Sequence, residues 1–140
     1  MKRFLALLGC AFLLTEGASF ASEGKTHGKH HTDMQMTKLH KMMPNYAKSQ
    51  ARINAALEKG DVAAIAKETG YLLSTAADLE KSKPHKKSKE LKEFQKLAKE
   101  FEKDVKATAE SARKEDIEGA KASFSKAEVA CDSCHAKFRY

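Results

Sequence analysis

Apolar side chains recur at intervals of three and four residues in four separate stretches of the chain. Those intervals place the side chains on one face of an α-helix, so each stretch predicts an amphipathic helix. The second stretch is typical, with Val62, Ile65, Thr69, Leu72, Ala76 and Leu79 on one stripe. No segment shows the sustained period-two alternation of a half-buried strand, which indicates an all-α protein.

Capping and helix-breaking residues set the expected boundaries. The predicted helices cover about residues 33–59, 61–81, 88–112 and 116–138. Gly60 suits a helix C-cap, and Asp61 and Asp116 suit N-caps. Pro44 lies inside the first helix and predicts a kink or restart near residues 40–44. Short connections between four helices favour an antiparallel up-down-up-down four-helix bundle.

The first 32 residues do not share this pattern. Two basic residues precede an apolar run over residues 4–14, which is too short to cross a bilayer. Residues 1–21 are typical of a cleavable signal peptide, and we expect cleavage after Ala21. Residues 7–10 loosely imitate a lipoprotein processing site, which leaves a lipid anchor at Cys10 as the alternative. We therefore predict an exported protein with no membrane span.

Residues 22–32 contain no apolar side chain and two glycines, so we expect a flexible N-terminal segment. Its His27, His30 and His31 could collect a transition metal, but a solvated His-Lys tail is the favoured interpretation. Residues 33–140 then form one domain. The chain has 26 Lys and Arg against 19 Asp and Glu, for a net charge of +7. Lys and Glu alternate evenly along the helices, which disfavours nucleic-acid binding and indicates solvated faces, with docking on acidic redox partners as the alternative.

The motif Cys131-Asp132-Ser133-Cys134-His135 lies five residues from the C-terminus. At this spacing two thiols can bond covalently to the vinyl groups of a haem while the adjacent imidazole binds its iron. A helix places Cys131 and His135 on one face with Cys134 beside them. We therefore predict one covalently attached haem c, with Cys131, Cys134 and His135 as cofactor-binding residues and His135 as an iron ligand.

Three other interpretations of this motif are weaker. A zinc site needs four ligands, and the chain offers no second cysteine pair. A thioredoxin-like pair opens a helix after a strand, whereas this pair lies late in a helical stretch. A disulfide over three residues would remove little chain entropy. Once the signal peptide is cleaved, no cysteine remains outside the motif.

A haem-attachment motif at the end of a four-helix chain, followed by Phe138 and Arg139, resembles the class II c-type cytochromes, the cytochrome c′ family. The resemblance covers roughly residues 33–140. It implies that a residue of the first helix meets the second face of the iron, and that this residue is a methionine in six-coordinate electron carriers or a non-ligating apolar residue in gas-binding members. It also implies that a homodimer can form. The family's basic residue four positions before the distal one is replaced by Leu39.

The first helix offers several donors for the sixth iron ligand. They are Met34, Met36, His40, Met42 and Met43. Helical phase places Met42 and Met43 near the apolar face, Met36 farther out, and His40 beyond its edge. Counting back from Gly60 puts Met43 close to the distal position that the resemblance implies, so we predict Met43 as the sixth ligand. His40 stays as the alternative because Pro44 can alter the phase, and the methionines can also be flexible core filler.

With both axial positions filled, the chain would carry single electrons between redox partner proteins in the periplasm. Such a role requires no catalytic acid or base, so we do not expect an enzyme. The alternative is a five-coordinate protein that binds nitric oxide or carbon monoxide at an open distal site. The crowding of ligands into residues 34–43 favours electron transfer.

Overall fold

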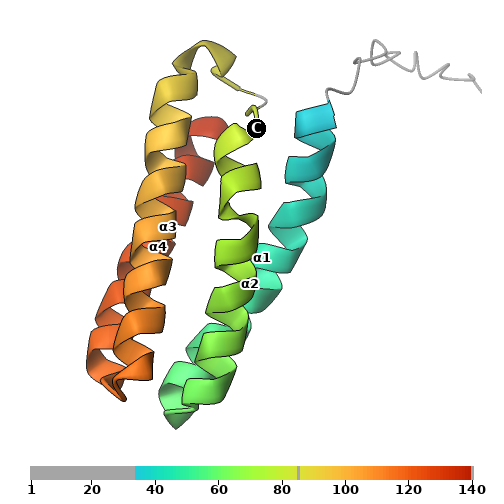
Figure 1. The fold of residues 1–140 in the computed structure, drawn as a ribbon. Coiled ribbons are helices and arrows are strands. Elements are labelled where there is room, and N and C mark those ends of the chain that lie inside the picture. The colour runs from blue at the N-terminus through green and yellow to red at the C-terminus, as the bar shows by residue number, and fades with distance from the viewer. Residues whose placement is uncertain (1–33, 85, 140) are drawn as a thin grey trace, which may run out of the picture. The chain divides into compact units, whose positions relative to one another are not determined.

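The computed structural model describes residues 34–84 and 86–139, and four helices account for most of them (Figure 1). The helices are α1 (Met34–Lys59), α2 (Val62–Lys81), α3 (Leu91–Arg113) and α4 (Ile117–Phe138), with a 3-10 turn η1 (Ser88–Glu90) before α3. No strand occurs within these residues. The predicted all-α four-helix bundle is confirmed. The expected signal peptide, residues 1–21, and N-terminal segment, residues 22–32, lie outside the described residues.

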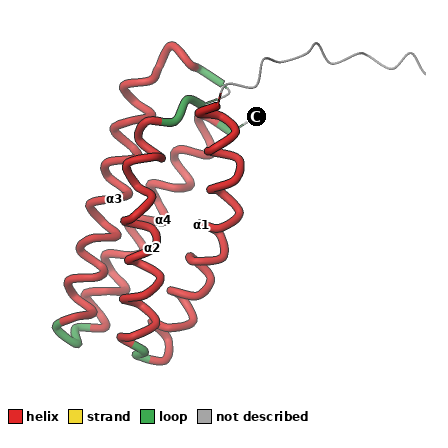
Figure 2. Tube along the Cα trace, turned by 45° about the vertical axis from the view of Figure 1, so that its right-hand side comes forward, coloured by secondary structure: helices red, strands yellow, loops and turns green. Residues whose placement is uncertain are grey.

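Short connections join the helices, so consecutive helices run antiparallel (Figure 2). Helix α3 packs against α2 and α4, and α2 packs against α1. In contrast, α1 and α4 make few direct contacts. The beginning of α1, the α2–α3 connection and the end of α4 all lie at one end of the bundle. This topology brings the first turns of α1 to the end that carries the Cys-Asp-Ser-Cys-His motif.

The predicted apolar stripes form the core. In α2, Ile65, Thr69, Leu72, Ala76 and Leu79 are all buried. The same holds for Phe94, Phe101, Val105 and Ala109 in α3 and for Ala120, Phe124, Ala127 and Phe138 in α4. Burial of such side chains is the main favourable contribution to folding, at roughly 25 cal/mol per Å².

One buried side chain of the interface between α1 and α2 is charged. Glu68 accepts a hydrogen bond from Ser49 Oγ at 2.8 Å and one from Arg52 Nη1 at 3.2 Å. Its carboxylate is therefore paired and hydrogen-bonded, as a buried charge must be to remain in a protein interior. The apolar pattern of α2 did not predict the burial of Glu68, because a charged residue is not counted in an apolar stripe. Glu68 is nevertheless buried, as is its neighbour Thr69.

Helix α1 is continuous through Pro44, so the restart expected near residues 40–44 does not occur. Proline removes one helical hydrogen bond. Met42 and Tyr46, on either side of it, are both buried against the rest of the bundle. Tertiary packing thus holds the flanking turns in the helical conformation.

The α1–α2 and α3–α4 turns have the same construction. Gly60 has φ of 65° and Glu115 has φ of 59°, both left-handed. In each turn the last helical carbonyls accept two backbone hydrogen bonds, as in a Schellman motif. The following residue, Asp61 or Asp116, then caps the next helix through its carboxylate, at 3.0 and 2.8 Å. Both predicted N-caps are confirmed.

Glu115 occupies a conformation that glycine adopts without steric cost. We expect Glu115→Gly to raise the free energy of unfolding by about 1 kcal/mol, measured by urea denaturation followed by circular dichroism. The control is Glu110→Gly inside α3. It should lower the free energy of unfolding by about 1 kcal/mol, because glycine is a poor helix former. A loss of stability in Glu115→Gly would contradict the left-handed assignment.

Candidate functional site

A cavity of about 430 Å³ lies at the motif-bearing end of the bundle, and all four helices contribute to its walls. Most of its lining is apolar. Representative residues are Leu39, Leu72, Phe94, Phe101, Phe124 and Phe138. Because α1 and α4 make few direct contacts, the bundle accommodates this volume without a break in any helix.

Helix α4 presents both thiols of the motif to the cavity. Cys131 and Cys134 are half-buried and are not joined by a disulfide. Burial raises the pKa of Cys131 to about 12, with smaller electrostatic contributions from Cys134, Asp132 and Glu128. Burial raises the pKa of Cys134 to about 11. Both side chains are therefore neutral thiols at physiological pH when the bundle is folded.

His135 follows one turn after Cys131 and also lines the cavity. Partial burial of the side chain, followed by the positive charge of Arg139, lowers the pKa of His135. A lowered pKa favours the neutral imidazole, which is the form that binds a metal. The spacing thus brings Cys131, Cys134 and His135 to one cavity, as the sequence predicted.

Helix α1 brings two of the five candidate sixth ligands to the same cavity. His40 and Met43 both line it, Met43 half-buried and His40 exposed. The other three methionines are not in the lining: Met42 is buried in the core, Met36 is half-buried, and Met34 is 76% exposed. Helical phase had placed His40 beyond the apolar stripe, yet the cavity extends far enough to reach it.

Tyr46 fixes the rotation of α1 beside the cavity. Its ring stacks on Phe101, with centroids 5.5 Å apart, and its hydroxyl lies 2.9 Å from Thr75 Oγ1 on α2. Burial raises the pKa of Tyr46 to about 12, so the phenol stays neutral. Since Tyr46 lies one turn after Met43, these contacts determine which side of α1 faces the cavity.

Glu128 joins α1 to α4 at the cavity wall. Its Oε1 accepts hydrogen bonds from Gln50 Nε2 and Asn54 Nδ2, each at 2.8 Å. Both Gln50 and Glu128 line the cavity. We call these three residues the α1–α4 clamp. Sequence reasoning missed the clamp, although one signal was present, because Glu128 stands one turn before Cys131 on the same helical face.

The donor set of this cavity fits a haem. One helix contributes two thiols and a neutral imidazole, a second helix contributes a thioether and an imidazole, and the surface between them is largely apolar. A family model described as Cytochrome C′ matches residues 35–139. The chain belongs to the cytochrome c′ family. No match is found among curated proteins or among solved structures.

Membership of the cytochrome c′ family makes the chain a haem-binding cytochrome of the electron-carrying or gas-binding kind, with haem c and iron as its cofactor. Within residues 34–84 and 86–139 no helix is both long enough and apolar enough to cross a membrane. Over the same residues, no group of three or more His, Cys, Asp and Glu side chains is arranged to hold a metal ion. His27, His30 and His31 lie outside the described residues, as does Cys10.

The raised thiol pKa values predict slow alkylation of the folded apoprotein. At pH 8 we expect Cys131 and Cys134 to react with iodoacetamide roughly a hundredfold or more slowly than in the urea-unfolded chain, because few thiolates are present. Mass spectrometry of timed samples measures both rates. Equal rates in the folded and unfolded chains would show that the thiols are not buried.

The clamp predicts a loss of stability in Glu128→Ala. The substitution removes two hydrogen bonds to a carboxylate. We expect the free energy of unfolding, measured by urea denaturation, to fall by about 1–2 kcal/mol. This value already allows for the solvent exposure of the hydrogen bond from Asn54. Glu128→Gln keeps an acceptor and should lose less. Glu58→Ala removes an exposed carboxylate from α1 and serves as the matched control. Equal effects at positions 58 and 128 would contradict the clamp.

Proposed function

We propose that this protein is a periplasmic one-electron carrier whose haem is attached covalently through Cys131 and Cys134. The observation that carries the proposal is that His135 on α4 and two potential iron ligands on α1, His40 and Met43, line one cavity. In a five-coordinate protein no strong donor would be needed on α1. Export through residues 1–21 fits haem attachment outside the bacterial cytoplasm, and that segment lies outside the described residues.

When bound, the haem supplies an iron that exchanges one electron between its ferrous and ferric states. The chain's own residues hold that iron in place. His135 would hold the iron with a neutral imidazole, and a donor from α1 would be its second protein ligand. The aromatic and aliphatic lining limits solvent access, which tunes the redox potential.

Met43 is the sixth ligand that we favour. It is half-buried and lies one turn before Tyr46, whose contacts with Phe101 and Thr75 hold this part of α1 in a fixed rotation. A thioether paired with an imidazole favours ferrous iron and raises the potential, whereas two imidazoles lower it. His40 lines the same cavity one turn earlier and remains the alternative ligand.

The two histidines that line the cavity, His40 and His135, are accounted for as candidate iron ligands, which supports a carrier over an enzyme. Glu128 already accepts two hydrogen bonds within the clamp. Tyr46 has a pKa raised to about 12 by burial. Tyr46 is therefore not suited to exchange protons near neutral pH.

One observation favours a second candidate function, the binding of nitric oxide or carbon monoxide. Leu39 lines the cavity at the position where the resemblance led us to expect a basic residue. Together with Phe101 and Phe124 it provides an apolar surface that would suit a small uncharged gas. This function requires that neither Met43 nor His40 binds the iron.

Substitution of the two donors tests the choice between these functions. We expect the reduced holoprotein to show sharp low-spin absorption bands, and Met43→Ala to convert them to a broad high-spin band that responds to carbon monoxide. His40→Ala should leave the spectrum unchanged. A wild-type protein that is already high-spin and binds carbon monoxide would overturn the carrier proposal in favour of gas binding.

The matched control is Met42→Ala, which removes a neighbouring methionine that is buried outside the cavity lining. We expect it to lower the free energy of unfolding by about 2–4 kcal/mol without changing the spin state. A spin-state change in His40→Ala but not in Met43→Ala would assign the sixth position to His40.

A further inference from the structure

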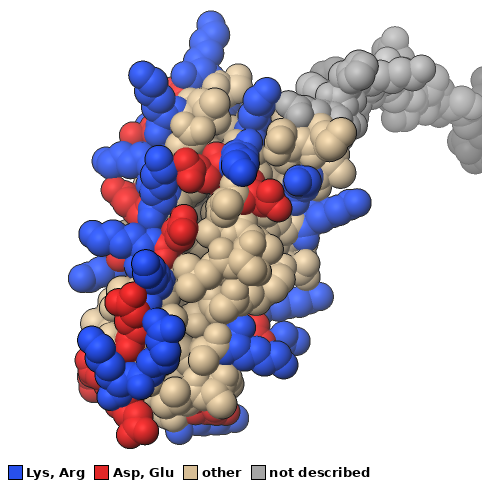
Figure 3. Space-filling model, viewed as in Figure 1, with Lys and Arg blue, Asp and Glu red and all other residues tan. Residues whose placement is uncertain are grey.

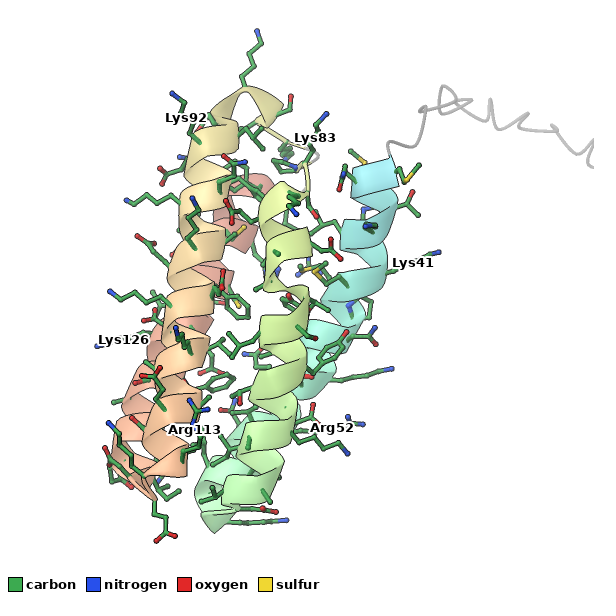
Figure 4. The ribbon with its side chains drawn as sticks, in the orientation of Figure 1. Lys41, Arg52, Lys83, Lys92, Arg113 and Lys126 are labelled. Atoms are coloured by element: carbon green, nitrogen blue, oxygen red, sulfur yellow. The ribbon has the colours of Figure 1, made fainter. Side chains whose placement is uncertain are left out.

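Positive charge gathers at the end of the bundle that holds the cavity. The α2–α3 connection and the first turn of α3 carry five lysines and two glutamates, Glu90 and Glu93, among their described residues. The lysines are Lys83, Lys86, Lys87, Lys89 and Lys92. All five are exposed. Figure 4 shows Lys83 and Lys92 extending from this upper end of the bundle.

At the opposite end of the bundle, acidic residues outnumber basic residues in both turns. In the α3–α4 turn, Arg113 and Lys114 face three acidic residues between positions 115 and 118. In the α1–α2 turn, Glu58 and Asp61 outnumber Lys59. Figure 3 shows blue side chains projecting from the upper end and mixed red and blue side chains at the lower end. The bundle is therefore electrically polar along its length.

The lysines lie at the same end of the bundle as the cavity. Pro84 lines the cavity and follows Lys83 directly in the chain. Arg139, at the end of α4, is exposed and also lines the cavity, close to His135. We define the basic rim as Lys83, Lys86, Lys87, Lys89, Lys92 and Arg139. The rim lies at the end of the bundle that carries the proposed proximal ligand.

Ion pairs with Glu90 and Glu93 offset part of the charge of Lys87 and Lys137. The one acidic residue of the α2–α3 connection, Glu90, accepts from Lys137 at 2.9 Å and lies 4.0 Å from Lys87. Lys137 adds a further positive charge from α4, 4.0 Å from Glu93. The exposed lysines 86, 89 and 92 thus present a net positive field to solvent. Charges of one sign that are grouped in this way attract a partner of opposite sign and orient it before contact.

We propose that the basic rim is the docking surface for an acidic electron-transfer protein. This inference rests on the proposed carrier function and names the surface and the chemistry of its partner. A carrier must bring its redox centre close to that of a protein partner, and the rim lies at the end of the bundle that holds the cavity. One electron leaves one centre and is gained by the other, with no bond made or broken. An anionic lipid surface also attracts lysines but exchanges no electron.

Reduced flavodoxin, a small acidic one-electron donor, serves as the probe, and stopped-flow absorption follows reduction of the ferric holoprotein. The rim variant is Lys86→Glu/Lys89→Glu/Lys92→Glu. At about 10 mM ionic strength we expect its second-order rate constant to fall roughly tenfold or more. At about 1 M salt the Debye length is about 3 Å, and the difference from wild type should vanish.

The matched control is Lys59→Glu/Lys114→Glu/Lys126→Glu, which makes the same change in net charge away from the rim. Figure 4 shows Lys126 in the lower half of the bundle. We expect its rate constant to stay within about twofold of the wild-type value, because steering depends on charge near the docking site. If the rate constant falls equally in the two variants, the effect comes from net charge alone and the rim is not the docking surface. If it falls in neither variant, the proposal is likewise overturned.

A second measurement separates a protein partner from a membrane. Vesicles of phosphatidylglycerol and phosphatidylcholine are sedimented with the holoprotein at the same ionic strength. Sedimentation that depends on Lys86, Lys89 and Lys92, without any effect of these residues on the flavodoxin rate, would overturn the proposal in favour of lipid binding. The spectrum of the wild-type holoprotein tests the carrier function separately, so failure of the rim and failure of the carrier are distinguishable.

Discussion

The cavity depends on the separation of α1 from α4, while other contacts keep α1 packed in the bundle. Direct contact between these two helices is sparse, and the cavity takes its place. Two sets of polar contacts keep α1 in position: the buried Glu68 with Ser49 and Arg52 on the α2 side, and the clamp through Glu128 on the α4 side. An apolar macrocycle between them would bury the exposed lining and complete the core, so binding and stability are coupled.

Local patterns predicted most of the fold. Apolar stripes located the four helices, and Gly60, Asp61 and Asp116 marked their ends because each satisfies backbone groups that the helix leaves unpaired. Of the kink or restart expected near residues 40–44, the restart is wrong, because α1 continues through Pro44. Whether a helix continues through a proline depends on how tightly the neighbouring turns pack. In α1 that packing comes from contacts with the other helices, which no local sequence pattern reveals.

The site was only partly predictable for the same reason. The motif on α4 identified its own residues, since the chemistry follows from their spacing. Which donors of α1 reach the cavity depends on the rotation of that helix, and this is set by Tyr46 against Phe101 and by Gln50 with Glu128, residues far apart in the sequence. A helical wheel drawn from α1 alone therefore placed His40 outside the site that it lines.

The protonation of Cys131 and Cys134 sets an order of events during biogenesis. In the folded bundle both thiols are shielded by the surrounding helices and keep their protons. If the haem is attached as proposed, the enzyme that joins it to these thiols would need access to sulfur atoms that the folded helices half bury. We therefore expect ligation to precede docking of α4.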